Sequence, residues 1–87
     1  MTRISFRPKA LYGLQQAPRK ERLRIQSAID ILEQGTFPPH SKKLEDTPQG
    51  YRLRISRWRV LFVLKDGEAE IVDIFIKKGR SDYRRRI

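Results

Sequence analysis

Two arginines at alternate positions of one predicted strand could together hold a phosphate group. Residues 51–59 contain four arginines and no carboxylate. At the two-residue period of a strand, Arg52 and Arg54 face one side, and the apolar residues beside them face the other. Arg59 follows on the next apolar run and would join them if the two runs pair as a hairpin. Because clustered cations repel one another, this group indicates a surface that binds an anion.

A second basic segment follows the last predicted strand and contains Lys77, Lys78, Arg80, Tyr83 and Arg84. The net charge is +10, from 20 lysines and arginines against 10 carboxylates, and the excess lies mainly in these two segments. Charge concentrated in this way favours nucleic acid as the partner, then an acidic protein, then an anionic membrane. The alternative is a solvated basic surface that only aids solubility, although such surfaces usually mix both signs.

The composition excludes several kinds of site. The chain has no cysteine and one histidine, His40, so it has no thiolate site and no site built from clustered histidines. We therefore expect no metal and no other cofactor. The lack of cysteine suits a reducing cytoplasm, which is the expected location. We read no signal peptide, and the apolar run 60–64 is too short to span a bilayer, so we expect no membrane partner.

The hydrophobic pattern predicts one domain, 1–87, with a strand, two helices and three further strands. The longer helix carries its apolar residues at helical spacing, namely Ile25, Ala28, Ile29 and Leu32. The expected strands are 2–6, 51–56, 58–64 and 70–76, the expected helices 9–16 and 19–34, and residues 36–50 form a loop.

The short links between the last three strands predict their pairing. Lys65-Asp66-Gly67-Glu68 contains the Asp-Gly pair that is typical of a tight hairpin, so these strands must pair in an antiparallel meander. The helical hairpin then buries its apolar stripe on one face of the sheet. This is an α+β fold with an N-terminal strand, a helical hairpin and a C-terminal antiparallel three-strand meander. Arg52 and Arg54 lie on the face away from the helices.

This order of elements resembles that of the RelE/ParE superfamily of type II toxin–antitoxin systems. Members often carry a Y-[KR]-[LIV]-[KR] strand and then a [YW]-R-[LV]-[LIV]-[YF] strand. A third strand, a basic cluster and a tyrosine follow, and a K-x-L segment precedes the first of these strands. The corresponding residues here are Tyr51-Arg52-Leu53-Arg54, Trp58-Arg59-Val60-Leu61-Phe62, Ile74-Phe75-Ile76-Lys77-Lys78, Arg80-Ser81-Asp82-Tyr83-Arg84 and Lys42-Lys43-Leu44.

The resemblance implies a toxin whose RelE-like branch cleaves mRNA in the ribosomal A site. There the ribose 2′-hydroxyl attacks the adjacent phosphate without a metal. It implies that Arg59 and Arg80 stabilise charge in the transition state and that Arg52 and Arg54 position phosphates and bases. Arg57 and Arg84 are further candidates for binding RNA. The implied partners are a cognate antitoxin, the ribosome and mRNA.

The group that takes the 2′ proton is left open at this stage. Members of the RelE-like branch often have lysine where this chain has Arg52 and Arg54, and arginine holds its proton too tightly to act as a base. Lys77 and Lys78 are candidates, because neighbouring cations favour the neutral form of a lysine. Tyr83 could transfer a proton or stack on a base. A Glu/His pair also occurs in the family, but Glu45 and His40 lie in the predicted loop and we do not favour them.

Two other functions stay open: a ParE-like poison of DNA gyrase, with gyrase as its partner, and a basic nucleic-acid-binding module without activity. Structural roles are also open for individual residues. Tyr51 is expected to pack rather than to stack on RNA, and Trp58 could do either. Arg59 could form an ion pair with Asp73 on the neighbouring strand. Tyr12 is expected to pack against the sheet edge.

Overall fold

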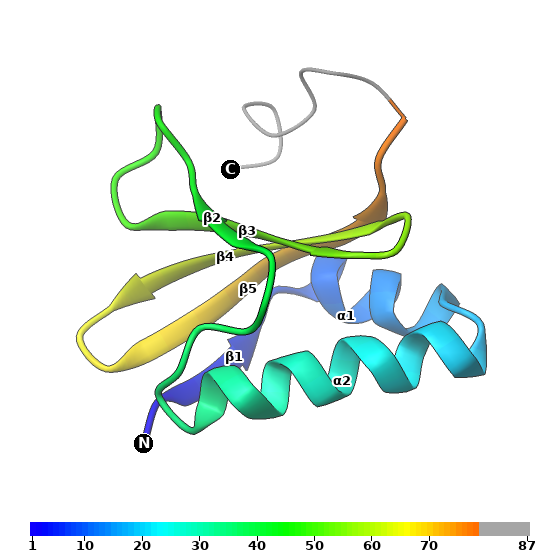
Figure 1. Ribbon diagram of the computed structural model, residues 1–87, viewed down its shortest axis with the longest axis horizontal. Coiled ribbons are helices and arrows are strands. Elements are labelled where there is room, and N and C mark those ends of the chain that lie inside the picture. The colour runs from blue at the N-terminus through cyan, green and yellow to red at the C-terminus, as the bar shows by residue number, and fades with distance from the viewer. Residues whose placement is uncertain (79–87) are drawn as a thin grey trace.

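The chain folds as a strand, two helices and four further strands, so the α+β prediction is confirmed (Figure 1). The computed structural model describes residues 1–78, and residues 79–87 lie outside the described part. The elements are β1 Arg3–Phe6, α1 Pro8–Gln16, α2 Arg19–Glu33, β2 Ser41–Lys43, β3 Gly50–Ile55, β4 Trp58–Lys65 and β5 Glu68–Ile76. Within this part, no helix is both long enough and apolar enough to cross a membrane.

The strands form one mixed sheet in the order β1-β5-β4-β3-β2. The antiparallel meander β3-β4-β5 is confirmed, and β1 adds to β5 as a parallel edge strand. Asp66 and Gly67 both have positive φ, 52° and 76°, as the two central residues of a type I′ hairpin turn require. Because this turn takes only two residues, Lys65 pairs with Glu68, and β5 begins two residues earlier than the predicted 70–76.

The predicted loop 36–50 contains a strand that the sequence pattern did not indicate. Strand β2 pairs antiparallel with β3, with Ser41 opposite Leu53 and Lys42 opposite Arg52. Three polar residues between prolines and turns are too few to show the alternation of a strand. The strand forms because the outer edge of β3 offers backbone groups that need partners.

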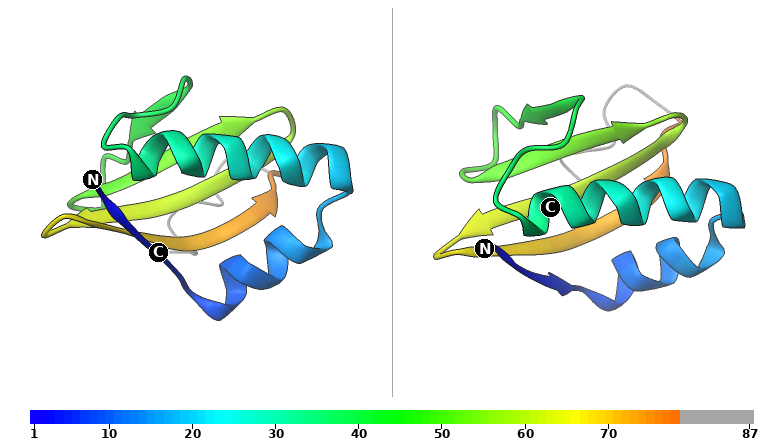
Figure 2. Two further views of the ribbon diagram at one scale, coloured as in Figure 1. Left: turned by 90° about the horizontal axis from the view of Figure 1, so that it is seen from below. Right: turned by 60° about the horizontal axis from the view of Figure 1, so that its bottom comes forward.

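Both helices cover the same face of the sheet, as predicted (Figure 2). The expected stripe of α2 is confirmed, since Ile25, Ile29 and Leu32 are buried and Ala28 packs against the same core. Helix α1 contributes Ala10 and Leu14. The sheet supplies the other side of this core with Leu53, Ile55, Trp58, Val60, Phe62, Ala69, Ile71 and Ile74.

Tyr12 does not pack against the sheet edge, and that expectation was wrong: its exposed fraction is 64%. Helix α1 turns Ala10 and Leu14 towards the sheet, and at 3.6 residues per turn Tyr12 lies on roughly the opposite side. The helix backbone also approaches the sheet closely at Gly13, beside the carbonyl of Ile74. This contact fixes the rotation of α1 and directs Tyr12 away from the sheet.

Candidate nucleic-acid interface

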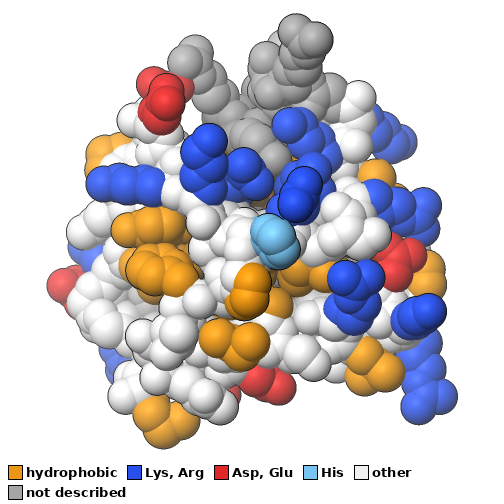
Figure 3. Space-filling view, in the orientation of Figure 1, with side chains coloured by type: hydrophobic (Ala, Val, Ile, Leu, Met, Phe, Trp, Pro, Cys, Tyr) orange, Lys and Arg blue, Asp and Glu red, His pale blue; other side chains and the backbone are white. Residues whose placement is uncertain are grey.

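A groove of about 420 Å³ lies at one end of the sheet, on the face opposite the helices. Its described lining contains five cationic side chains and no carboxylate. Figure 3 shows lysine and arginine side chains gathered above and beside the single histidine. The groove is lined by His40, Ser41, Lys42, Arg52, Arg54, Arg59 and Lys77.

The register places like charges directly opposite each other at two neighbouring positions. Arg54 of β3 pairs with Arg59 of β4, and Lys42 of β2 pairs with Arg52 of β3. Like charges facing each other across a ladder destabilise a sheet, by about 0.2–1 kcal/mol per pair. The sheet thus gives up folding free energy at this spot to keep cations side by side, which suits the binding of a polyanion.

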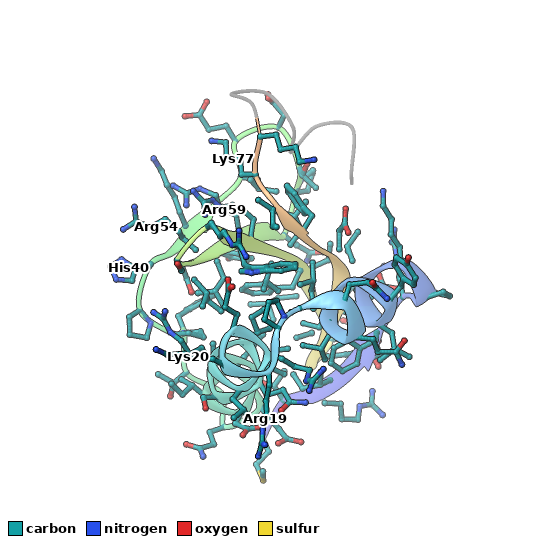
Figure 4. The ribbon with its side chains drawn as sticks, turned by 90° about the vertical axis from the view of Figure 1, so that its right-hand side faces the viewer. Arg19, Lys20, His40, Arg54, Arg59 and Lys77 are labelled. Carbon is teal, nitrogen blue, oxygen red and sulfur yellow. The ribbon has the colours of Figure 1, made fainter. Side chains whose placement is uncertain are left out.

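Backbone carbonyl groups of the β3–β4 turn hold Arg59 in place. Its Nη1 donates to the carbonyl oxygens of Ser56 at 3.1 Å and Trp58 at 2.9 Å. These bonds fix the guanidinium at the end of the hairpin beside Arg54. Figure 4 shows Arg54, Arg59 and Lys77 together with His40, whereas Arg19 and Lys20 lie apart from them on α2.

Arg59 and Asp73, the ion pair of the structural alternative, lie on neighbouring strands but not directly opposite each other. Phe75 lies opposite Arg59, and Leu61 lies opposite Asp73. Asp73 is almost fully buried, and its carboxylate lies 3.5 Å from Nζ of Lys9 on α1. Asp73 therefore helps to fasten α1 to β5.

Arg57 was expected to bind RNA, but the structure places it outside the groove, in the turn between β3 and β4. Its Nε and Nη2 donate to both oxygens of Glu21 on α2, at 3.3 and 3.0 Å. The hydrogen bond from Arg57 is the main cause that lowers the pKa of the Glu21 carboxyl below its usual 4.5, and the Trp58 side chain and the charge of Arg57 add to it. This ion pair ties the turn to the helix layer.

The remaining predicted site residues follow the end of β5, and of these the structure describes Lys77 and Lys78. Lys77 lines the groove, and its N–H donates to the carbonyl of Arg57 at 3.3 Å. Lys78 is exposed and does not line the groove. Arg80, Tyr83 and Arg84 lie outside the described residues.

The groove also contains two residues that the sequence analysis did not place there, Lys42 and His40. Lys42 enters through β2, whose pairing with β3 brings it opposite Arg52. His40 precedes β2, and its carbonyl accepts the N–H of Arg54 at 3.3 Å. The basic segment Lys42-Lys43 was the available signal, but the missed strand hid which of its side chains faces the site.

The aromatic residues of the two central strands serve packing. Tyr51 stacks on Phe62, with centroids 5.5 Å apart and planes 15° apart, and Phe37 lies 5.0 Å from Tyr51. The packing role predicted for Tyr51 is confirmed, and Trp58, which is 5% exposed, also belongs to the core. In residues 1–78, no three His, Asp or Glu side chains are grouped so as to hold a metal ion.

Solved structures that match this architecture include toxins of toxin–antitoxin systems. The isolated RelE toxin of E. coli matches with a TM-score of 0.74 and 16% identity, over 98% of this chain and 94% of that one. RelE in the RelB–RelE complex of Methanococcus jannaschii matches with a TM-score of 0.73 and 16% identity, over 83% of this chain and 88% of that one. The YoeB–YefM complex of Staphylococcus aureus matches with a TM-score of 0.70 and 17% identity, over 90% of this chain and 99% of the matched chain.

No protein-family model and no curated protein sequence matches the chain. The likeness therefore lies in the path of the backbone rather than in the amino acids. It extends over most of the chain and includes the sheet that carries the groove. The chain has the RelE-like fold, which it shares with the RelE and YoeB toxins of toxin–antitoxin complexes.

Proposed function

We propose that the chain is the toxin of a type II toxin–antitoxin system and that it cleaves mRNA on the ribosome. One observation carries this proposal: a groove with five cationic side chains lies on the helix-free face of a RelE-like sheet. Neither the fold nor the charge alone would be sufficient, because a fold supports many functions and basic surfaces occur on many proteins.

The proposed reaction begins with an RNA phosphodiester in the groove. The 2′ oxygen bonds to phosphorus, the bond from phosphorus to the 5′ oxygen breaks, and a 2′,3′-cyclic phosphate and a 5′-hydroxyl result. Negative charge grows on the phosphoryl oxygens as the 2′ oxygen attacks. Arg59 and Arg54, side by side on β4 and β3, can each present two N–H groups to these oxygens. Arg52 and Lys42 are assigned to neighbouring phosphates.

The other proposed site residues follow the family pattern. Lys77 lies in the groove and Lys78 directly after it, and both are proposed for proton transfer or charge stabilisation. Arg80, Tyr83 and Arg84 are proposed for charge stabilisation, for stacking or proton transfer, and for phosphate binding respectively. Arg57 is not retained among them, because its guanidinium is engaged by Glu21 outside the groove.

The test is cleavage of a defined mRNA in a reconstituted bacterial translation system, with the 5′ ends of the fragments mapped by primer extension. We expect cuts in phase with the codon in the A site for the wild type, and a loss of at least about 100-fold with Arg59→Ala. Arg57→Ala is the matched control, since it removes an arginine two residues away and outside the groove. Intact mRNA with wild-type protein would refute the nuclease. DNA breaks in expressing cells would then indicate gyrase, and normal growth a binding module.

An antitoxin is the proposed partner, by analogy with the RelB–RelE and YefM–YoeB complexes. We expect an acidic, amphipathic segment, because the groove supplies positive charge and Phe6, Leu11 and Tyr12 expose apolar surface. A partner that binds only the folded toxin at 100 times its Kd adds about 2.7 kcal/mol. At roughly 4–8 °C per kcal/mol for a domain of this size, the complex should melt roughly 10–20 °C above the free toxin. Equal melting temperatures would exclude such a partner.

A further inference from the structure

His40 lies where two hollows of the surface meet. It lines the basic groove, and it also lines a second hollow of about 580 Å³ between α2, residues 38–40 and the end of β3. Arg54 is the other residue that the two hollows share. A phosphate in the groove would therefore have His40 beside it. The second hollow is within the size range of small-ligand sites and leaves room for the adjoining nucleoside.

The backbone holds His40 in a defined position. Its φ is 68°, in the left-handed region, which costs a residue with a side chain about 1–2 kcal/mol. Its carbonyl accepts the N–H of Arg54. The residues around it are also held, because the Ser41 hydroxyl donates to the Pro38 carbonyl at 2.7 Å. The imidazole is exposed on this fixed backbone. Its place at the mouth of the groove is thus set by β2 and β3.

The groove needs a group that can accept a proton. Among residues 1–78, the charged side chains that line the two hollows with His40 are all cations: Lys42, Arg52, Arg54, Arg59 and Lys77 in the groove, and Arg24 in the second hollow. Arginine does not release its proton at physiological pH, and lysine ordinarily keeps its proton there too. Imidazole is the side chain suited to gaining and losing a proton near neutrality, and it is common as a general base.

We propose that the imidazole of His40 is the catalytic base that removes the proton from the attacking 2′-hydroxyl. This inference rests on the proposed nuclease function. The proton passes to the imidazole as the bond from the 2′ oxygen to phosphorus forms, and the departing 5′ oxygen takes a proton from water. The imidazolium then returns its proton to solvent. Arg54 and Arg59 stabilise the phosphoryl oxygens during the step.

Binding can be tested without catalysis, because His40 is the only histidine of the chain and its imidazole NMR signals need no assignment. The probe is a short 2′-O-methyl RNA, which has no free 2′-hydroxyl and cannot be cleaved. With this RNA bound, we expect the imidazole signals to change position, because a phosphodiester then lies beside the ring. Arginine side-chain signals that respond while the imidazole does not would overturn the inference but leave RNA binding intact. No response from either would overturn both.

Catalysis is tested with His40→Asn, because asparagine tolerates the left-handed backbone and cannot act as a base. We expect its cleavage rate in the translation system to fall about 10²–10⁴-fold, far more than its affinity for the 2′-O-methyl RNA changes. Lys43→Asn is the control, since Lys43 is exposed in β2 outside the groove. A variant rate equal to that of the wild type would overturn the inference.

Discussion

The pair Arg54 and Arg59 works against the stability of the sheet. The two side chains face each other across β3 and β4, where like charges repel. We predict that Arg54→Gln raises the free energy of unfolding by about 0.5 kcal/mol, measured by urea denaturation at low ionic strength. The same change should weaken the binding of single-stranded RNA, measured by fluorescence anisotropy.

Arg57→Gln is the comparison variant, because Arg57 lies two residues beyond the end of β3 and outside the groove. It removes the two hydrogen bonds to Glu21 and leaves the groove intact. The variant should lose a little stability and keep its affinity for RNA. If Arg54→Gln destabilised the fold, or if both variants lost RNA affinity equally, the groove would not be the binding surface that we propose.

The Glu21–Arg57 pair also predicts a dependence on pH. The hydrogen bond from Arg57 lowers the pKa of Glu21 in the folded protein, so the unfolded chain takes up this proton more readily. The stability contributed by the pair is present above about pH 4.5 and is lost as the pH falls through the folded value. Glu21→Gln should therefore lower the urea midpoint more at pH 7 than at pH 3. Glu45→Gln, which alters an exposed loop carboxylate, is the control.

Among the elements, α1 depends on one glycine. A methyl group at Gly13 would overlap the carbonyl oxygen of Ile74 in β5, and neither backbone can yield easily. We predict that Gly13→Ala costs about 2–3 kcal/mol, despite the better helix propensity of alanine, and lowers the melting temperature accordingly. Gln15→Ala, which changes an exposed position of the same helix, should be nearly neutral. A stabilised Gly13→Ala variant would show that α1 does not approach β5 this closely.

The elements that the sequence predicts are those with a repeating pattern. The stripe of α2, the alternation of β3 and the Asp66-Gly67 turn each have a local signal, so the meander and the helical layer follow from them. Strand β2 has none, because its three residues are ordered by the edge of β3. Because β2 was not predicted, the positions of Lys42 and His40 in the groove were not predicted either. The ion pair between Arg57 and Glu21 was also hidden, because it joins residues 36 positions apart.

On the scale of the whole molecule, affinity for RNA should depend on where the charge lies rather than on its total. Releasing counterions from single-stranded RNA contributes about −0.7 per phosphate contact to the slope of log K against log salt concentration. The five cations of the groove therefore predict a slope of about −3.5, measured by anisotropy over a salt series. A much steeper slope would mean that cations beyond the groove also contact the RNA.

Two double variants separate the position of the charge from its amount, since each lowers the net charge by two. Lys42→Gln with Arg54→Gln removes two groove cations and should reduce the slope to about −2. Lys20→Gln with Lys65→Gln removes two exposed cations outside the groove and should leave it near −3.5. Long-range attraction alone would affect both variants equally, because it depends on the overall field of the protein. Equal slopes for the two variants would therefore refute a defined groove, whereas unequal slopes would locate the RNA on the end of the sheet where β2, β3 and β4 meet.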